Sequence, residues 1–292
     1  MEIEIAKEIG FCFGVRKAIE KLDETLEKEN EKVYITGELI HNKDLLKKYE
    51  GKKVEFNQDI SSYNERGIVI IRSHGISDEE REKINSNPNV IKVIDATCPY
   101  VLRVHQLTKK MYKDGYHIVI IGEADHPETR GYYLNIKDRA TVINSKEEIS
   151  KIPKVKKVAV FAQTTMDYQK FKEIVGEMVT EFEEIRTFTT ICPPVYNRQK
   201  SAEELSKRCD LVIILGGYNS SNTKKLRDLC AKYTDTVHIE NIRQLDPKTL
   251  EGKRKIGIVA GTSTPDWIIE EAYNFLKSRQ VKDSRVFSEN SY

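Results

Sequence analysis

The stretch VIKVIDATCPYV, residues 90–101, carries the strongest indication of the fold class. An apolar, β-branched run ends at Cys98, and Pro99, which suits the first position of a helix, follows it. The pattern recurs as IGFCFGV at 9–15 and as IRTFTTICPPV at 185–195, each time with a valine three residues after the cysteine. One such strand-to-helix junction in each third of the chain indicates a threefold repeat.

Further strand-like runs follow each cysteine in the same order. Each third has a strand that ends in polar residues or glycine, then a short strand-like segment, then a buried-looking strand that ends in small polar residues. Apolar runs of this kind between amphipathic helices predict parallel strands covered on both faces, and so an α/β architecture. The runs are VYITGELIHN from 33, IVIIGEADHPE from 118 and LVIILGGYNSSN from 211; KVEFNQDI from 53, ATVINSKEEI from 140 and TVHIENIRQL from 236; GIVIIRSHGIS from 67, VAVFAQTTMDY from 158 and KIGIVAGTSTPDW from 255.

The repeat predicts three similar α/β subdomains with parallel sheets, arranged as a pseudo-threefold trefoil. We expect the subdomains at 1–97, 98–191 and 192–282, with 283–292 as a C-terminal tail. Because parallel sheets bind ligands at the carboxyl ends of their strands, the three cysteines and the polar strand ends would face one centre. A single large doubly wound sheet is the alternative that the chain length leaves open.

Composition narrows the function classes. With 48 basic and 46 acidic residues, the chain favours neither nucleic acid nor an anionic membrane as a partner. No apolar run approaches the roughly 18 residues of a membrane span. The first residues, MEIEIAKEIG, are acidic and strand-like rather than typical of a signal peptide. Together with five widely spaced cysteines, these features predict a cytoplasmic protein with free thiols.

The five cysteines fall into two groups. Cys12, Cys98 and Cys192 stand at strand-to-helix junctions, where the positive end of the following helix favours a thiolate. We expect Cys209 and Cys230 to be buried small hydrophobic residues. Three thiolates could hold zinc with an open fourth position, or a 4Fe-4S cluster in which one iron lacks a protein ligand. The spacing alone leaves both metals open.

Eight motifs resemble one enzyme family. GFCFGV, RSHGIS, DATCPYV, HPET, QTT, TICPPVYNRQ, GGYNSSNT and AGTSTP are similar, in this order from residue 10 to about 265, to the motifs of 4-hydroxy-3-methylbut-2-enyl diphosphate reductases. The resemblance implies a trefoil around one central 4Fe-4S cluster on Cys12, Cys98 and Cys192. It implies that the substrate, an allylic alcohol diphosphate, loses its hydroxyl as water at the open iron with uptake of two electrons and protons, giving isopentenyl and dimethylallyl diphosphate. The resemblance also implies a ferredoxin or flavodoxin as the electron donor.

The resemblance also assigns roles to single residues. It makes Glu128 the proton donor and puts Thr164 beside the substrate hydroxyl, so that both are catalytic. A lone loop glutamate is usually a solvated charge, but this one lies at a strand's carboxyl end, just after a histidine and a proline. With no P-loop or arginine cluster, the diphosphate would rely on helix N-termini and on hydroxyl, amide and imidazole donors. The residues implied to bind the substrate are His41, His74, His126, Thr164, Ser220, Ser221, Asn222 and Ser263.

Two local patterns predict helix starts. Ser77 and Glu80 have the spacing of a capping box, and Thr264 before Pro265 indicates an N-cap followed by proline at the first helical position.

Two other function classes remain as alternatives. A non-catalytic iron-sulfur redox sensor could use the three cysteines, although it would need neither an anion pocket nor a positioned acid. A zinc hydrolase of a phosphorylated substrate would use a zinc-bound water, usually with His or carboxylate ligands beside thiolate.

Overall fold

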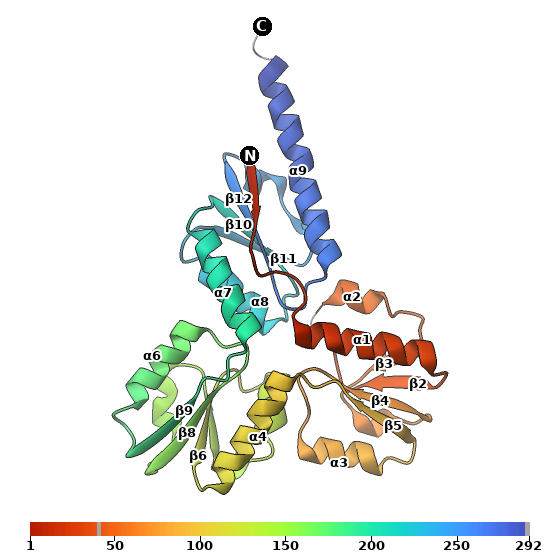
Figure 1. The fold of residues 1–292 in the computed structure, drawn as a ribbon, viewed down its shortest axis with the longest axis vertical. Helices are drawn as coiled ribbons and strands as arrows, with labels where there is room; N and C mark the ends of the chain where they lie inside the picture. Colours follow the sequence, from red (N-terminus) through yellow and green to blue (C-terminus); the bar gives the residue numbers. More distant parts are fainter. Residues whose placement is uncertain (40–41, 290–292) are drawn as a thin grey trace. The chain divides into compact units, whose positions relative to one another are not determined.

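The structure, a computed structural model, describes residues 1–39 and 42–289 (Figure 1). The strands of this part of the chain form three four-stranded sheets in which every pairing is parallel. The predicted α/β fold of three parallel-sheet subdomains is confirmed, and the alternative of one large sheet is wrong for the described residues. The chain divides into a smaller unit, within residues 1–12, 41–48 and 193–292, and a larger unit, within 13–40 and 49–192.

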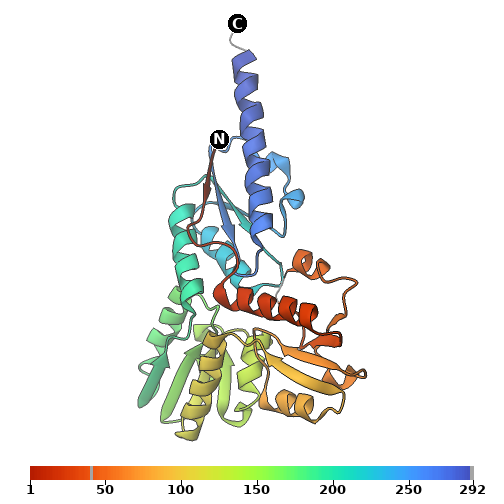
Figure 2. The same cartoon turned by 45° about the vertical axis from the view of Figure 1, so that its right-hand side comes forward.

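The larger unit contains two of the sheets, each flanked by helices (Figures 1 and 2). The first sheet has the strand order β3-β2-β4-β5 and the second has β7-β6-β8-β9. The elements of the first are α1 (Phe13–Lys28), β2 (Lys32–Ile35), β3 (Val54–Phe56), η1 (Ile60–Ser62), β4 (Gly67–Ile71), α3 (Asp78–Ser86) and β5 (Val90–Asp95). Those of the second are α4 (Pro99–Lys113), β6 (His117–Ile121), α5 (Pro127–Tyr133), η2 (Lys137–Arg139), β7 (Ala140–Ile143), η3 (Lys146–Lys151), β8 (Lys157–Ala162), α6 (Tyr168–Met178) and β9 (Glu184–Phe188).

The smaller unit contains the third sheet, with the strand order β1-β12-β10-β11. Its first strand comes from the N-terminus of the chain and the other three from the last third. Its elements are β1 (Glu2–Ile5), α2 (Lys43–Lys47), α7 (Pro193–Ser206), β10 (Leu211–Leu215), α8 (Ser221–Cys230), β11 (Asp235–Ile239), η4 (Ile242–Gln244), η5 (Pro247–Leu250), β12 (Lys255–Ala260) and α9 (Asp266–Glu289).

The pairing of β1 shows how the repeat is closed. In all three sheets, the strand that precedes a cysteine is an edge strand next to the last buried strand of the repeat: β1 beside β12, β5 beside β4, and β9 beside β8. The N-terminal strand, which the sequence division groups with residues 1–97, therefore pairs within the sheet of the last third. The helix α9 continues to Glu289, into the segment 283–292 that the same division treats as a tail.

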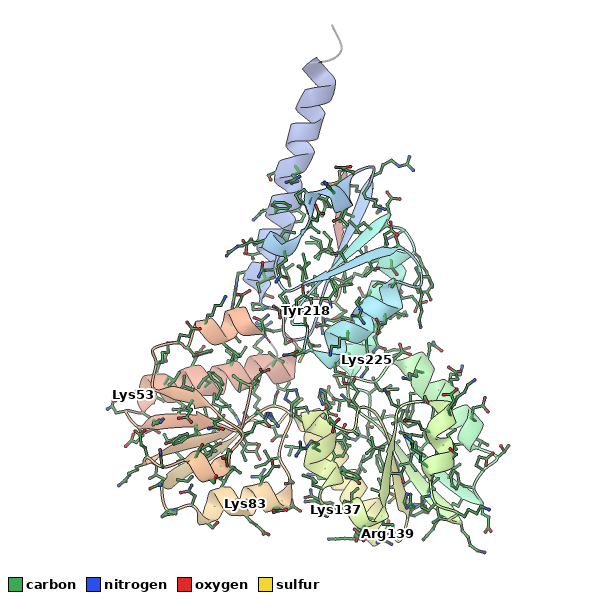
Figure 3. The ribbon with its side chains drawn as sticks, turned by 180° about the vertical axis from the view of Figure 1, so that it is seen from behind. Lys53, Lys83, Lys137, Arg139, Tyr218 and Lys225 are labelled. Carbon is green, nitrogen blue, oxygen red and sulfur yellow. The ribbon has the colours of Figure 1, made fainter. Side chains whose placement is uncertain are left out.

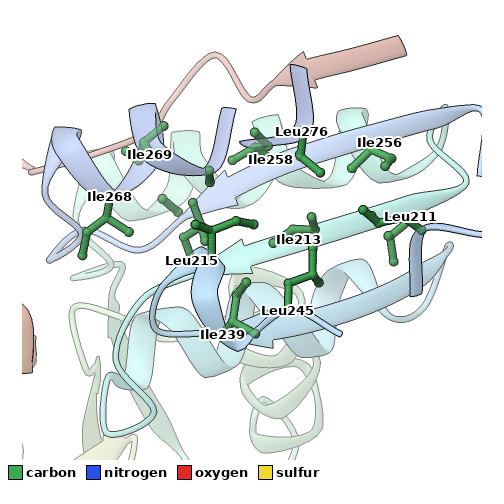
Figure 4. Close-up of a cluster of buried hydrophobic side chains, with 14 residues drawn as sticks. Leu211, Ile213, Leu215, Ile239, Leu245, Ile256, Ile258, Ile268, Ile269 and Leu276 are labelled. Carbon is green, nitrogen blue, oxygen red and sulfur yellow. The ribbon is translucent and has the colours of Figure 1, made fainter. Parts of the chain in front are cut away.

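The core of the third sheet explains why its strands are continuously apolar. On β10, Leu211, Ile213 and Leu215 pack on one face, together with side chains of β12 and α9 (Figure 4). The alternate residues Val212 and Ile214 pack on the other face against α7 and α8. A strand covered on both faces has no side that could be polar.

The helix starts agree with the sequence patterns except at α9. Ser77 and Glu80 form the expected capping box, and α4 and α7 begin with Pro99 and Pro193. The prediction for Thr264 is wrong, because α9 begins at Asp266 and the Thr264 hydroxyl donates a hydrogen bond to the Leu215 carbonyl, 2.9 Å away. That bond fixes the loop after β12 against β10. No helix in the described part of the chain is both long and apolar enough to cross a membrane.

Candidate active site

The three junction cysteines are anchored in the same way. Each backbone N–H donates to the carbonyl of the second residue after a buried strand, namely β12, β4 or β8. Each cysteine is half-buried, is not part of a disulfide and lies directly before a helix. The donor and acceptor pairs are Cys12 with Thr262 (3.1 Å), Cys98 with Ser73 (3.0 Å) and Cys192 with Thr164 (3.0 Å).

The two units meet along the chain at two of these cysteines. Cys12 is the last residue of its segment in the smaller unit, and Cys192 is the last residue of the larger unit before Pro193. Cys98 lies within the larger unit, which thus holds two of the three thiols. In the part of the chain that the structure describes, no three Cys, His, Asp or Glu side chains are arranged to hold a metal ion.

The surroundings of Cys98 require a glycine. At Gly14, two residues after Cys12, a Cβ atom would lie 2.6 Å from the sulfur of Cys98. Any larger residue at this position would collide with that sulfur. Cys98 occupies the N-cap position of α4, but its side chain makes no capping hydrogen bond.

Glu128 is the most buried carboxyl group of the candidate site, with 1% of its surface exposed. Its carboxyl group accepts hydrogen bonds from the Thr164 backbone N–H at 2.8 Å and from the Thr164 hydroxyl at 2.5 Å. On the other side, the Glu128 N–H donates to Nδ1 of His126 at 3.2 Å, so His126 caps α5. Thr164 therefore fixes the carboxyl group, and the start of α5 fixes its backbone.

A continuous series of contacts in the larger unit joins the two cysteines through this acid. Ser73, which anchors Cys98, precedes His74, and the His74 ring meets the His126 ring edge to face with centroids 5.4 Å apart. His126 caps the helix that carries Glu128. The Thr164 bound to Glu128 in turn anchors Cys192. The larger unit thus brings together six of the predicted site residues: Cys98, Cys192, His74, His126, Glu128 and Thr164.

The smaller unit contains the predicted polar cluster at the start of α8. Ser220 is the N-cap and accepts a hydrogen bond from the Thr223 N–H at 3.3 Å, while Ser221 accepts one from the Lys225 ammonium at 2.8 Å. Figure 3 shows Lys225 on α8. Asn222, which is 2% exposed, has no partner for its side-chain oxygen or nitrogen among the described residues.

Two further buried hydroxyls in this cluster lack partners in the described chain. They belong to Ser263, in the loop that follows β12, and to Thr223 in α8. The two segments are close, since a Cβ at Gly261 would lie 2.2 Å from the Thr223 hydroxyl oxygen. Buried polar atoms normally have a hydrogen-bond partner, so such a group is an expected place for a polar ligand. The backbone N–H of Cys12 donates a hydrogen bond to the same loop, at the Thr262 carbonyl.

Some of these features were not predicted. Gly14 carries a weak sequence signal, because glycine within a helix is unfavourable unless space demands it. Thr223 ends the polar run NSSNT, but the sequence does not show its burial. Tyr132, which burial and the nearby Glu128 give a pKa well above its ordinary value, carries no sequence signal at all. His41 lies outside the described residues.

Comparisons with known proteins show the family of this chain. The family described as "LytB protein" matches residues 3–277. The chain belongs to this family. It is 39% identical to the 4-hydroxy-3-methylbut-2-enyl diphosphate reductase of Geotalea uraniireducens, over 93% of this chain and 95% of that protein. It is 40% identical to the reductase of the same name from Clostridium perfringens, over 94% and 97% of the two chains.

Two solved structures are also similar. One, described as the terminal enzyme of the non-mevalonate pathway, is an (E)-4-hydroxy-3-methyl-but-2-enyl diphosphate reductase that is 37% identical, with a TM-score of 0.68 over 95% of this chain and all of the other. The other is described as the E-1-hydroxy-2-methyl-but-2-enyl-4-diphosphate reductase from Plasmodium falciparum; it is 30% identical, with a TM-score of 0.88 over 94% and 87% of the two chains. The predicted membership of a reductase family is therefore confirmed.

Proposed function

We propose that this chain catalyses the reductive dehydroxylation of 4-hydroxy-3-methylbut-2-enyl diphosphate to isopentenyl and dimethylallyl diphosphate. The observation that carries the proposal is the buried Glu128, fixed by Thr164, which in turn anchors Cys192. A buried carboxyl group that is held rigidly by the residue anchoring Cys192 suits an acid that acts on a substrate bound at a cofactor of that cysteine. The names of the relatives support the same reaction.

The proposed cofactor is one 4Fe-4S cluster held by Cys12, Cys98 and Cys192. Three half-buried cysteines outside any disulfide, each at a helix N-terminus and with the same backbone anchor, fit such a group. When bound, a cluster with one open iron supplies electrons and a Lewis acid. Gly14 leaves room at the Cys98 sulfur. Zinc fits the thiols as well, but it cannot supply the electrons that a reductase needs.

In this proposal, the residues of the larger unit handle the substrate hydroxyl. Glu128 donates the proton that lets the oxygen leave as water, because hydroxide is a poor leaving group. The Thr164 hydroxyl, which donates to the Glu128 carboxyl group, keeps that group in one orientation and lies beside the substrate oxygen. His126 holds the helix that presents Glu128 and donates to the diphosphate.

The proposed diphosphate site combines the start of α8 with the loop after β12. Unpaired N–H groups at a helix N-terminus attract anions, and hydroxyl and amide donors add specificity. The unpartnered polar atoms of Asn222 and Ser263 fit this role, since an anion would provide the missing hydrogen bonds. The full proposed set is His41, His74, His126, Thr164, Ser220, Ser221, Asn222 and Ser263.

Purification without oxygen tests the function. We expect a brown protein with about four iron and four sulfide per chain, which converts the allylic diphosphate with dithionite and methyl viologen as reductant. Iron without turnover would favour the redox sensor, whereas a colourless zinc protein that hydrolyses a phosphorylated substrate would favour the zinc hydrolase. The proposal includes a cytoplasmic location, where the thiols stay reduced, and a ferredoxin or flavodoxin as electron donor.

A further inference from the structure

The first turns of α1 and α4 lie together in the larger unit. α1 begins directly after Cys12 and α4 directly after Cys98. The close approach of Gly14 to the Cys98 sulfur shows that the two turns touch, and Figures 1 and 2 both show them side by side. We call the exposed surface of these two turns the α1/α4 face; it comprises Phe13, Arg16, Lys17, Glu20, Pro99, Tyr100, Leu102 and Arg103.

The α1/α4 face exposes large apolar side chains. Phe13 is 58% exposed, Leu102 37% and Tyr100 36%. Phe13 and Tyr100 stand at the starts of the two adjoining turns, whereas Leu102, two residues after Tyr100, points to a different side of α4. Exposed aromatic residues are enriched at the centres of protein interfaces.

The face is also positively charged. Arg16, Lys17 and Arg103 are exposed, and none forms an ion pair with a side chain in the described part of the chain. By contrast, Lys28 at the other end of α1 is paired with Glu24. Glu20 is the one carboxylate that these turns expose within the described residues. A patch with this charge attracts an acidic surface.

We propose that the α1/α4 face docks a small acidic ferredoxin, the protein that delivers electrons to this enzyme. The inference rests on the proposed function, in which Cys12 and Cys98 hold the electron acceptor. Both turns begin at these cysteines, so a carrier bound there has its redox centre close to the acceptor. Each encounter oxidises one ferredoxin by one electron, and two encounters supply the two electrons that the reduction consumes.

The helix α7, which follows Cys192, also has an exposed aromatic residue with a cation one turn later. On α7, Tyr196 is 41% exposed, and the exposed cation Lys200 follows four residues later on the same helix face. The spacing resembles that of Tyr100 and Arg103 on α4. An exposed aromatic residue with a cation one turn later therefore follows all three junction cysteines, which supports a common purpose.

The test compares charge reversals. The variant Arg16→Glu/Lys17→Glu/Arg103→Glu alters the α1/α4 face, and Arg103→Glu alone is the milder form. Lys137→Glu is the control in the same unit, because Lys137 is exposed and has no ion pair within the described chain (Figure 3). Its neighbour Asp138 bonds to Tyr112 at the far end of α4, about 18 Å along the helix from Tyr100.

Two measurements on the cluster-loaded enzyme test whether ferredoxin binds at the α1/α4 face. One is the affinity for a purified acidic ferredoxin by titration calorimetry at low and at physiological salt. The other is the rate with reduced ferredoxin compared with the rate with dithionite and methyl viologen. We expect the triple variant to lose about tenfold or more in ferredoxin affinity and rate, with iron content and dithionite-driven rate unchanged. Lys137→Glu should match the parent in everything.

Several outcomes would overturn the proposal. Parental ferredoxin affinity in the triple variant is one, and an equal loss in Lys137→Glu is another. A changed oligomeric state with unchanged ferredoxin affinity would make the face a contact between copies of the chain instead. Failure of the proposed function would be seen separately, as absence of dithionite-driven turnover in the parent enzyme. The ferredoxin affinity would then still show whether the α1/α4 face is the docking site.

Discussion

Glu128 is the residue on which the proposed chemistry depends most, because its carboxyl group is the proposed proton donor. Glu128→Gln keeps the shape, and its amide oxygen can still accept from the Thr164 backbone N–H while its amide nitrogen donates to the Thr164 hydroxyl oxygen, but it cannot deliver a proton. We expect turnover to fall by about 10²- to 10⁴-fold, while the iron content and the substrate affinity change little, since the Glu128 side chain is not among the proposed diphosphate donors.

Asp125 provides the matched control for this prediction. It lies in the loop directly before α5, the helix that carries Glu128, but it is exposed, so Asp125→Asn should keep parental kinetics. The measurements are steady-state rates across pH and substrate titration of the cluster spectrum. Turnover of Glu128→Gln within threefold of the parent would assign the proton to another group, with Thr164 next in line.

The five cysteines can be sorted experimentally. Burial raises the pKa of Cys209 to about 11 and that of Cys230 to about 12, so both stay protonated thiols at neutral pH and are poor metal ligands. Cys12→Ser, Cys98→Ser and Cys192→Ser should each lose most iron and nearly all activity. Cys230→Ala should keep its iron and lose about 1 kcal/mol of stability. Equal iron in Cys98→Ser and Cys230→Ala preparations would contradict this sorting.

At the scale of elements, variants at the start of α8 and in the loop after β12 should separate effects on folding stability from effects on diphosphate binding. Ser220→Ala removes the N-cap bond and should cost about 1 kcal/mol in the free energy of unfolding. Ser263→Ala removes a hydroxyl without a partner in the described free enzyme, so stability should hold or rise. Both variants should lower kcat/KM, with a loss of transition-state stabilisation of about 1–3 kcal/mol, at constant iron content. Parental kcat/KM in both would remove the diphosphate assignment.

The two helical glycines in α1 and α6 make a matched pair. At Gly14 a Cβ would collide with the Cys98 sulfur, so Gly14→Ala should displace that thiol and lower iron content and turnover together. At Gly176 a Cβ would meet no atom within 4 Å, so Gly176→Ala should stabilise α6 by about 0.5–1 kcal/mol and leave iron unchanged. Iron analysis and urea unfolding of both variants check the pair. Full iron in Gly14→Ala would mean that the Cys98 sulfur is not constrained in this way.

At the scale of the whole chain, local sequence patterns predict the elements better than their pairing. The β-branched runs locate the strands of all three sheets, since strands covered on both faces must be apolar throughout. The joining of β1 to β12 has no local signature, because pairing over the full length of the chain depends on closure of the repeat. The start of α9 was missed because Thr264 bonds to a strand carbonyl instead of capping the helix.

The candidate site divides in the same way. Motif spacing and family resemblance locate Glu128 and Thr164, and the structure adds the two hydrogen bonds between them. The steric requirement at Gly14 and the burial of Thr223 could not be predicted, because both depend on segments distant in sequence. Surface exposure is likewise invisible in the sequence, so the α1/α4 face required the structure.

Acid lability is a property of the whole molecule to which one buried histidine should contribute measurably. Burial, aided by Lys109, lowers the pKa of His105 from 6.5 to about 4. Between these values the unfolded chain binds a proton that the folded chain does not, so the contribution to stability is lost as pH falls from 6.5 toward 4. By pH 5 the loss should reach about 2 kcal/mol.

His105→Gln tests this, because glutamine binds no proton in either state. The variant should lose less stability than the parent between pH 7 and pH 5, whatever the substitution itself costs at pH 7. Burial also lowers the pKa of His117 and His238, but both remain in the variant, so their effects cancel in the difference. Urea unfolding of both proteins at pH 7, 6 and 5 measures that difference. Parallel curves would mean that His105 takes up its proton equally in the folded and unfolded chains, and the acid lability would then have to arise from other groups.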